Sequence, residues 1–313
     1  MFISRYITLT SCPDDDFTCK DGTCVSLEER CNGKMDCNDS SDEKDCTAIR
    51  IFPGYNKHLV PPPLGNDDSL LMNISINVDQ IITVDENGGH FKTKITMIRR
   101  WINPQLSYLN LKRSIELNQI PKEDRERMWM PWMTYKNIDQ ADDIKVTDQN
   151  DIMMILPHSE FKFEKDGRSN IYNTRVFKGS ENIIFYKRQS TVNWSCDYNM
   201  RWYPFDVQRC TMEMFPSSSS ITLFPTMVTY SGPLNLPQHF VKGVNICTLI
   251  YNNRTGIVVE VYLGRPLFGT TLSVFLPTSI LLILSQMVRI FGADHLEMVV
   301  EVNLTLLLVL ATL

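Results

Sequence analysis

Two cysteines, Cys196 and Cys210, enclose thirteen residues that read Asp-Tyr-Asn-Met-Arg-Trp-Tyr-Pro-Phe-Asp-Val-Gln-Arg. A disulfide between them would close a compact loop with a Tyr-Pro-Phe-Asp turn at its tip. The tip is an aromatic–proline pair followed by one carboxylate. The alternative is an ordinary hairpin disulfide in a secreted β-domain. Both interpretations require the Cys196–Cys210 bond.

Cysteine usage indicates the compartment. The chain has nine cysteines, and six of them fall between Cys12 and Cys46. So many cysteines in so short a segment predict an oxidising, extracellular location. The same segment carries eleven Asp and Glu against four Lys and Arg, whereas the whole chain has a net charge of −5. The acidity therefore belongs to one small module, and nothing in the charge pattern indicates nucleic-acid binding.

The acidic module is too short to fold on a hydrophobic core alone, so disulfides or a metal must stabilise it. Oxygen-bearing side chains gather near its end at Asn32, Asp36, Asp42 and Glu43. Such ligands suit a hard cation and predict a structural calcium ion. Zinc is the alternative metal, but the thiols lack the close paired spacing of a zinc ribbon and lie among carboxylates.

The pattern Cys-x6-Cys-x4-Cys-x6-Cys-x5-Cys-x8-Cys with Ser-Asp-Glu resembles the LDL-receptor class A repeat. This resemblance implies that the backbone carbonyls of Glu29 and Lys34 complete the calcium shell. Asn32 replaces the usual aspartate, and Glu29 replaces an aromatic residue that often helps to grip a partner lysine. These departures predict weaker calcium affinity and argue against lipoprotein-type ligand binding. The resemblance also implies the disulfides Cys12–Cys24, Cys19–Cys37 and Cys31–Cys46.

Alternating apolar residues fill the middle of the chain. Period-two alternation interrupted by Asp-Glu-Asn-Gly-Gly at 85–89 and Lys-Asp-Gly at 165–167 predicts antiparallel strands and hairpins. The spacing of the turn signals predicts a β-sandwich of roughly ten short strands. The apolar runs are Leu71 to Val78, Ile81 to Val84, Phe91 to Ile98, Ile183 to Tyr186 and Ile257 to Tyr262.

The ending Trp-Tyr-Pro-Phe-Asp-Val-Gln-Arg-Cys of the cystine loop resembles the loop that gives the Cys-loop receptors, the pentameric ligand-gated ion channels, their name. Tyr55 to Pro62 is similar to the approach to the first strand of that family. Trp101-Ile-Asn-Pro-Gln-Leu resembles the end of its second strand, and Trp129-Met-Pro-Trp its first agonist-contact loop. Core packing is the alternative for each tryptophan alone. Their order and spacing together favour the family, which implies an immunoglobulin-like ligand-binding sandwich.

The positions that would bind an agonist depart from the family. Cationic transmitters are held by aromatic rings, each contributing about 0.5–2 kcal/mol. Thr96 and Ser217 stand where the resemblance implies aromatic residues, so an aromatic box for acetylcholine is not expected. The candidate agonist contacts are Tyr135, Arg188 and Tyr251, each with a structural role as the alternative.

Glycosylation sequons begin at Asn73, Asn193 and Asn253, all on the predicted extracellular side. Asn38-Asp-Ser matches the same pattern, but it lies in the predicted calcium loop. Cys247 has no evident partner in the sequence.

A run of twenty-three uncharged residues, Pro266 to Val288, is long enough to span a bilayer as a helix. Arg265 precedes this run directly. In the family, an arginine here pairs with the aspartate of the cystine loop and couples the ligand site to the pore. The resemblance gives these roles to Asp206 and Arg265. Two solvated interface charges are the alternative.

A second apolar run begins at Met298. On a helix, one face would carry polar side chains, which are costly against lipid and should line water. The run resembles the pore-lining helix of the family, with Leu308 at the hydrophobic gate. Acidic residues stand where anion channels carry Pro-Ala-Arg, and this favours cations. The predicted pore face consists of Glu297, Glu301, Thr305, Leu308 and Thr312.

The sequence thus predicts a small disulfide-rich calcium module (11–47), an all-β immunoglobulin-like sandwich (53–265) and an α-helical transmembrane segment (266–313). The first membrane helix is expected at about 266–288 and the second from about 297. We expect the chain to be a fragment, lacking a signal peptide and ending within the second membrane helix.

The expected function is a cation-preferring subunit of a ligand-gated ion channel in the plasma membrane, with a synaptic position as one option. Its expected partners are a small-molecule agonist, further subunits of a homo- or hetero-pentamer, and membrane lipid. The rival interpretation is an adhesion or endocytic receptor in which the repeat captures a ligand. No enzyme motif such as His-Glu-x-x-His or Gly-x-Ser-x-Gly occurs.

Overall fold

The structure is a computed structural model of the 313-residue chain. It describes residues 11–13, 16–44, 46–65, 68–138, 144–146, 151–160, 162–164, 174–252, 254–270, 275–291, 300–301 and 303–305. Two compact units divide the chain. The first comprises Met1–Ser195, Thr211–Gly232 and Asn245–Glu260, and the second comprises Cys196–Cys210, Pro233–Val244 and Val261–Leu313.

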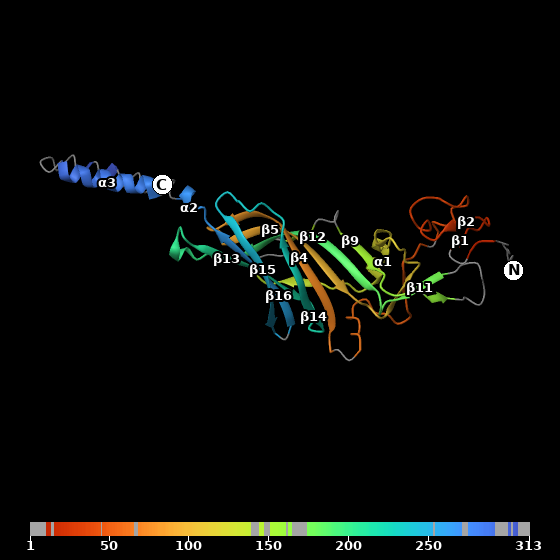
Figure 1. The fold of residues 1–313 in the computed structure, drawn as a ribbon. Coiled ribbons are helices and arrows are strands. Elements are labelled where there is room, and N and C mark those ends of the chain that lie inside the picture. The colour runs from red at the N-terminus through yellow and green to blue at the C-terminus, as the bar shows by residue number, and fades with distance from the viewer. Residues whose placement is uncertain are drawn as a thin grey trace. The chain divides into compact units, whose positions relative to one another are not determined.

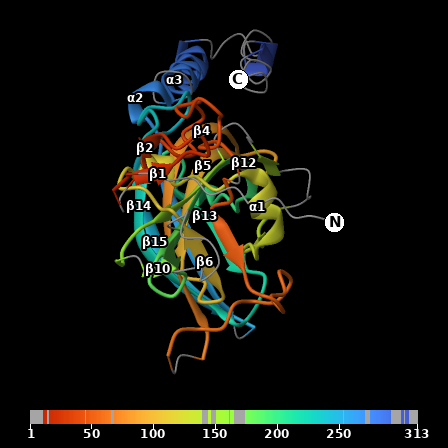
Figure 2. The same cartoon turned by 90° about the vertical axis from the view of Figure 1, so that its right-hand side faces the viewer.

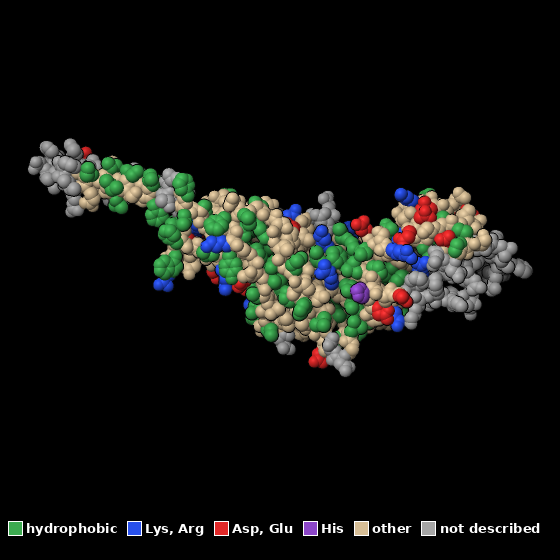
Figure 3. Space-filling view, viewed as in Figure 1, with side chains coloured by type: hydrophobic (Ala, Val, Ile, Leu, Met, Phe, Trp, Pro, Cys, Tyr) green, Lys and Arg blue, Asp and Glu red, His purple; other side chains and the backbone are tan. Residues whose placement is uncertain are grey.

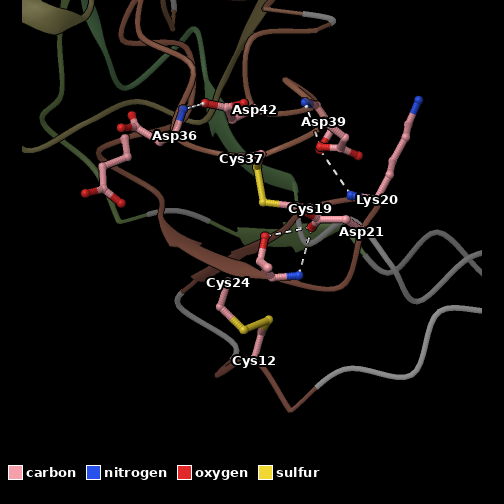
Figure 4. Close-up of a disulfide and its surroundings, with 12 residues drawn as sticks. Cys12, Cys19, Lys20, Asp21, Cys24, Asp36, Cys37, Asp39 and Asp42 are labelled. Atoms are coloured by element: carbon pink, nitrogen blue, oxygen red, sulfur yellow. Dashed lines mark hydrogen bonds between the residues drawn. A yellow bond between two sulfur atoms is a disulfide. The ribbon is translucent and has the colours of Figure 1, made fainter.

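The acidic module forms one short antiparallel pair, β1 (Asp16–Thr18) with β2 (Cys24–Ser26). Its small core consists of Phe17, Leu27 and two cysteines, and the guanidinium of Arg30 lies 4.6 Å from the centre of the Phe17 ring. Such a core is far too small to stabilise the module without covalent links. Three disulfides supply them, namely Cys12–Cys24, Cys19–Cys37 and Cys31–Cys46. Figure 4 shows the first two of these bonds.

Within the first unit, the module contacts the β-sandwich through Lys112. The ammonium of Lys112 donates hydrogen bonds to the carbonyls of Glu28 at 3.1 Å and Cys31 at 3.2 Å. The backbone N–H of Arg113 donates to the Glu28 carboxylate at 3.0 Å. Burial lowers the pKa of Lys112. A buried ammonium needs such acceptors, so the module is docked by specific polar contacts.

Three long strands form one half of the sandwich and lie side by side in Figure 1. These are β4 (Leu70–Asp85), β5 (His90–Trp101) and β12 (Ile183–Ser195), with β5 in the middle. The predicted turn at 85–89 joins β4 to β5, with Asp85 pairing His90, and this hairpin is confirmed. The two runs predicted as separate strands at 71–78 and 81–84 are instead parts of the single strand β4, whose pairing with β5 has two irregularities of register.

The other half of the sandwich surrounds β16 (Arg254–Gly264), which pairs with β15 (Phe240–Tyr251). Strand β14 (Ile221–Tyr230) joins the two halves, because it pairs in parallel with β4 from Ile221 to Tyr230 and with β16 at Thr222. Hydrogen bonding therefore runs through ten strands in the order β7-β13-β16-β14-β4-β5-β12-β8, with β15 and β9 attached. The remaining strands of this sheet are β7 (Met133–Tyr135), β8 (Ile144–Val146), β9 (Ile152–Leu156) and β13 (Val207–Pro216).

Alternate side chains of these strands fill the core, as a pleated sheet with one buried face requires. Within the first unit the core includes Ile74, Ile76, Trp101, Trp194 and Val259, all at most 2% exposed. The all-β sandwich following a disulfide-rich module is therefore confirmed. A smaller sheet has the order β10-β11-β6-β3, with β3 (Ile49–Ile51), β6 (Leu106–Leu109), β10 (Lys162–Glu164) and β11 (Thr174–Lys178). Figure 2 gives a second view of these strands.

Helices are few in the described residues. The sandwich carries the short helix α1 (Lys122–Arg127) and the single 3-10 turns Ile115–Leu117 and Met200–Trp202. Near the C-terminus lie α2 (Leu267–Thr270) and α3 (Leu276–Phe291), and Figure 3 shows hydrophobic side chains covering α3. No helix among the described residues has both the length and the hydropathy needed to cross a membrane. The membrane span expected at 266–288 therefore remains a prediction.

Candidate functional site

The cystine loop is closed by the Cys196–Cys210 disulfide, and its Tyr203–Pro204 peptide bond is cis. Its tip exposes large apolar side chains, with Trp202 71% and Phe205 73% exposed, although Asp206 between them and the strand is only 6% exposed. The loop thus combines an apolar, solvent-facing tip with one buried carboxylate.

Arg265 is the partner of that carboxylate. Its Nε lies 2.9 Å from Oδ1 and 3.1 Å from Oδ2 of Asp206, and its guanidinium lies 4.8 Å from the centre of the Tyr203 ring. Gln208 donates a further hydrogen bond to Asp206. Burial alone would raise the pKa of Asp206, but the hydrogen bonds from Arg265 and Gln208 and the nearby positive charge lower it below its usual value. The pair is thus ionised at neutral pH and ties the cystine loop to the chain two residues before α2.

The candidate agonist contacts divide into two places in the first unit. Tyr135 and Arg188 both line a cavity of about 190 Å³. Tyr251, at the end of β15, lies instead beside Phe215, with ring centres 5.9 Å apart. Ser217 lines a different cavity of about 650 Å³ together with Trp132.

Lys136 covers the Tyr251 ring. Its ammonium lies 3.9 Å from the ring centre and 3.6 Å from the carboxylate of Glu213. An ammonium over a tyrosine face is the arrangement by which aromatic rings bind cationic ligands. Here a side chain of the chain itself provides the cation.

Thr96 is buried, and its hydroxyl bonds to another side chain of the sandwich. It is 6% exposed, and its hydroxyl donates to the Asp79 carboxylate at 2.6 Å. Gln189, directly opposite Thr96 on β12, donates to the same carboxylate at 2.7 Å. Thr96, at which the sequence resemblance implies an aromatic residue, thus belongs to a polar cluster.

The predicted calcium ligands lie in a hydrogen-bonded loop of the acidic module. Asp42 is fully buried; one of its carboxylate oxygens accepts from the backbone N–H of Asp36 at 2.7 Å, and the other has no hydrogen-bond partner. Figure 4 shows Asp36 and Asp42 joined in this way. The Glu43 carboxylate accepts from the N–H groups of Asn32 at 2.8 Å and Gly33 at 3.1 Å.

In the part of the chain that the structure describes, no group of three or more His, Cys, Asp or Glu side chains is arranged to hold a metal ion. A buried carboxylate oxygen without a partner is nevertheless costly unless a cation or donor compensates it. The donor set of Asn32, Asp36, Asp42 and Glu43 is oxygen-rich, as calcium requires.

Comparisons with known proteins fit this geometry. The family model described as the neurotransmitter-gated ion-channel ligand binding domain matches residues 46–222. The chain belongs to this family. A second model, the low-density lipoprotein receptor domain class A, matches residues 10–46. The Cys-loop receptor and class A assignments made from the sequence motifs are therefore confirmed.

Three curated relatives illustrate both resemblances. The acetylcholine receptor subunit alpha-type deg-3 of Caenorhabditis elegans is 29% identical over 154 residues, which is 49% of this chain and 24% of that protein. The CD320 antigen of Homo sapiens is 46% identical over 56 residues, 18% of this chain and 19% of that protein. The vitellogenin receptor of Solenopsis invicta is 49% identical over 35 residues, 11% of this chain and 2% of that protein. Each match covers a quarter or less of the relative's own length.

Sequence reasoning about this receptor-type domain missed Lys136. Neighbouring residues of an extended chain point to opposite faces. A prediction that Tyr135 faces the agonist therefore places Lys136 on the opposite face. Lys136, Phe215 and Tyr251 come together through the pairing of β7 with β13, of β13 with β16 and of β16 with β15. Period-two alternation applied to residues 133–136 could have raised Lys136 as a candidate.

The other predicted site residues have simple surroundings. Asn73 is exposed, Asn193 is half-buried, and Asn253 lies outside the described residues. Cys247 on β15 is exposed and outside any disulfide. Of the predicted pore face, Glu297, Leu308 and Thr312 also lie outside the described residues, whereas the Thr305 hydroxyl donates to the Glu301 carbonyl at 3.0 Å.

Proposed function

We propose that this chain is part of a subunit of an extracellular ligand-gated ion channel of the plasma membrane, with its N-terminal region outside the cell. The match of the ligand-binding domain over residues 46–222 carries the proposal. Pentameric assembly and a small-molecule agonist follow from membership of this family. The expected domain boundaries are 11–47, 53–265 and 266–313.

The Asp206–Arg265 pair is proposed to couple the sandwich to the membrane segment. The ion pair is almost fully buried, with side-chain exposures of 3% and 7%. Only Pro266 separates Arg265 from α2, so movement of the cystine loop would pull on the start of the membrane segment. The exposed apolar tip of the loop supports the same role, because exposed apolar patches mark interaction surfaces.

The agonist of this subunit is proposed to differ from acetylcholine. Lys136 already occupies the face of Tyr251 and is neutralised by Glu213. A quaternary ammonium would have to displace this lysine and share a ring with it. A ligand that pairs with Lys136 through an acceptor, or an accessory role for this subunit, agrees better with these contacts.

The pore is proposed to prefer cations. Five copies of Glu301 and Glu297 would place carboxylate rings in a narrow passage of low dielectric, where each attracts cations more strongly than in bulk water. Thr305, Leu308 and Thr312 complete the proposed face. Repulsion between neighbouring carboxylates would favour protonation of some of them. The negative charge of each ring would then be smaller, but the ring would still attract cations.

The class A module is proposed to bind a structural calcium ion. Its ligands would be the side-chain oxygens of Asn32, Asp36, Asp42 and Glu43 and the carbonyls of Glu29 and Lys34. The unpaired buried oxygen of Asp42 supports this set. Asn73, Asn193 and Asn253 are proposed glycosylation sites on the same extracellular side.

Voltage clamp of the full-length subunit in oocytes tests the function. We expect at least one small amine, amino acid or other transmitter-like compound to open a conductance whose reversal potential follows sodium. Glu301→Gln and Glu297→Gln should each weaken that preference, whereas the same change at the exposed Glu123 of α1, Glu123→Gln, should leave it unchanged. A reversal potential that follows chloride would refute the cation assignment. A surface-expressed subunit that stays silent alone and with partner subunits would refute the channel function.

A further inference from the structure

A cavity of about 190 Å³ inside the sandwich is lined by two arginines, Arg99 on β5 and Arg188 on β12. Its volume corresponds to about six water molecules at about 30 Å³ each. The cavity is separate from the Lys136–Tyr251 contact, and neither of those two residues lines it.

The strand register places the two arginines together. Arg99 lies directly opposite Tyr186, and Met97 lies opposite Arg188. Residues two apart on a strand share a face, so Arg99 and Arg188 are diagonal neighbours on one face, a spacing of roughly 7–8 Å. Two positive charges thus border one small space.

Neither arginine is fully satisfied by the protein. Arg99 is 5% exposed; its Nη1 donates to the Pro131 carbonyl at 2.5 Å, and its guanidinium lies 4.6 Å from the centre of the Tyr186 ring. Among the described residues, the buried Nε atoms of both Arg99 and Arg188 have no hydrogen-bond partner. Burial, with a smaller effect from Arg188, lowers the pKa of Arg99. An arginine nonetheless stays charged in proteins, so these donors require an anion or another acceptor.

One oxygen of a nearby carboxylate, Oδ2 of Asp151, already has partners. Asp151 accepts from the Tyr186 hydroxyl at 3.0 Å, lies 3.8 Å from Nη1 of Arg125, and does not line the cavity. Its single negative charge is opposed by three arginines in this region. Among the described residues that line the cavity, Arg99 and Arg188 carry a charge, and both charges are positive.

We propose that this cavity binds a small monocarboxylate between the two guanidinium groups. A carboxylate offers two oxygens, one for each unpaired Nε, and arginine is the residue best suited to planar recognition of carboxylates. Met97 and Trp132 supply apolar wall for a short alkyl chain. The proposal concerns binding within the sandwich and does not depend on the channel function.

Sodium butyrate is the probe, added to the purified full chain and measured by saturation-transfer NMR and by thermal unfolding. Sodium chloride at equal ionic strength is the reference. Arg188→Gln removes one donor and should weaken butyrate binding about tenfold to a hundredfold, as expected for loss of a hydrogen bond to a charged group. Lys187→Gln is the matched control, because it removes the neighbouring charge on the opposite face of β12 and should change nothing.

Arg188→Lys keeps the charge but loses the planar fork, so it should bind butyrate at an intermediate strength. If Arg188→Gln does not fold, the strength of butyrate binding by Arg188→Lys tests the role of Arg188 instead. Equal binding by wild type and both Arg188 variants would overturn the proposal, as would equal loss in Lys187→Gln. If chloride or phosphate raises the unfolding temperature as much as butyrate does, the assignment of the ligand as a carboxylate is overturned.

Discussion

Reversing the charges of Asp206 and Arg265 is the sharpest test of the coupling role. Both oxygens of Asp206 accept from the Nε of Arg265, at 2.9 and 3.1 Å, and among the described residues Gln208 is the one further side-chain donor to that carboxylate. Arg265→Asp would therefore leave two buried carboxylates facing each other. Removing one partner of a buried pair costs about 3–5 kcal/mol, a large share of the roughly 5–15 kcal/mol that stabilises a domain.

The expected result is that Asp206→Arg and Arg265→Asp each abolish gating or assembly, whereas the double reversal restores part of it. The assay is agonist-evoked current normalised to surface expression, with thermal unfolding of the purified chain beside it. The exposed pair Lys178–Glu181, 3.6 Å apart with side chains 54% and 46% exposed, is the control, and its reversal should cost only about 0–1 kcal/mol.

The pH dependence of the same pair has a definite sign. The pKa of Asp206 is lowered in the folded protein, so its stabilising contribution is present above the unfolded pKa of about 3.9 and is lost as the pH falls through the lower folded value. The stability difference between wild type and Arg265→Gln should therefore shrink in acid. A double reversal no better than either single change, at matched surface expression, would show that the two residues do not act as a pair.

Other predictions address the agonist region, the module and the fold. Lys136→Ala should increase the affinity for tetramethylammonium several-fold by freeing the Tyr251 ring, whereas Lys178→Ala, which breaks a surface ion pair of the same 3.6 Å length, should not. Calcium should raise the unfolding temperature of the full chain, and Asp42→Asn should abolish that rise while Asp39→Asn, which changes a half-buried carboxylate outside the proposed ligand set, retains it. Equal shifts in chelator and calcium would contradict the metal site. Gly179→Ala should destabilise by more than about 2 kcal/mol, because an added Cβ would lie 2.2 Å from the Asn103 carbonyl and 2.4 Å from that of Leu106; unchanged unfolding would contradict this.

Local chemistry made much of this molecule predictable. The hairpin at 85–89 follows from a Gly-Gly turn between alternating runs, where Gly89 adopts a φ of 70°. The cystine loop and the class A module follow from cysteine spacing, since covalent links leave strong sequence patterns. These features depend on residues close together in the chain.

Contacts that depend on distant register were not predictable. The pairing of Arg188 with Met97 joins residues ninety-one positions apart, and no local pattern fixes it. The parallel pairing of β14 with β4, which unites both halves of the sandwich, depends on the fold as a whole. The alternation rule identified buried faces but not which polar side chains would meet on them.

The exposed thiol of Cys247 makes the receptor-type domain directly accessible to optical measurement. Eight of the nine cysteines are held in disulfides, so a maleimide dye would attach at this one position without any engineered mutation. Cys247 lies on β15, four residues before Tyr251 and its covering lysine. Fluorescence from that dye would report whether this hairpin moves when a ligand arrives, even in a subunit that passes no current.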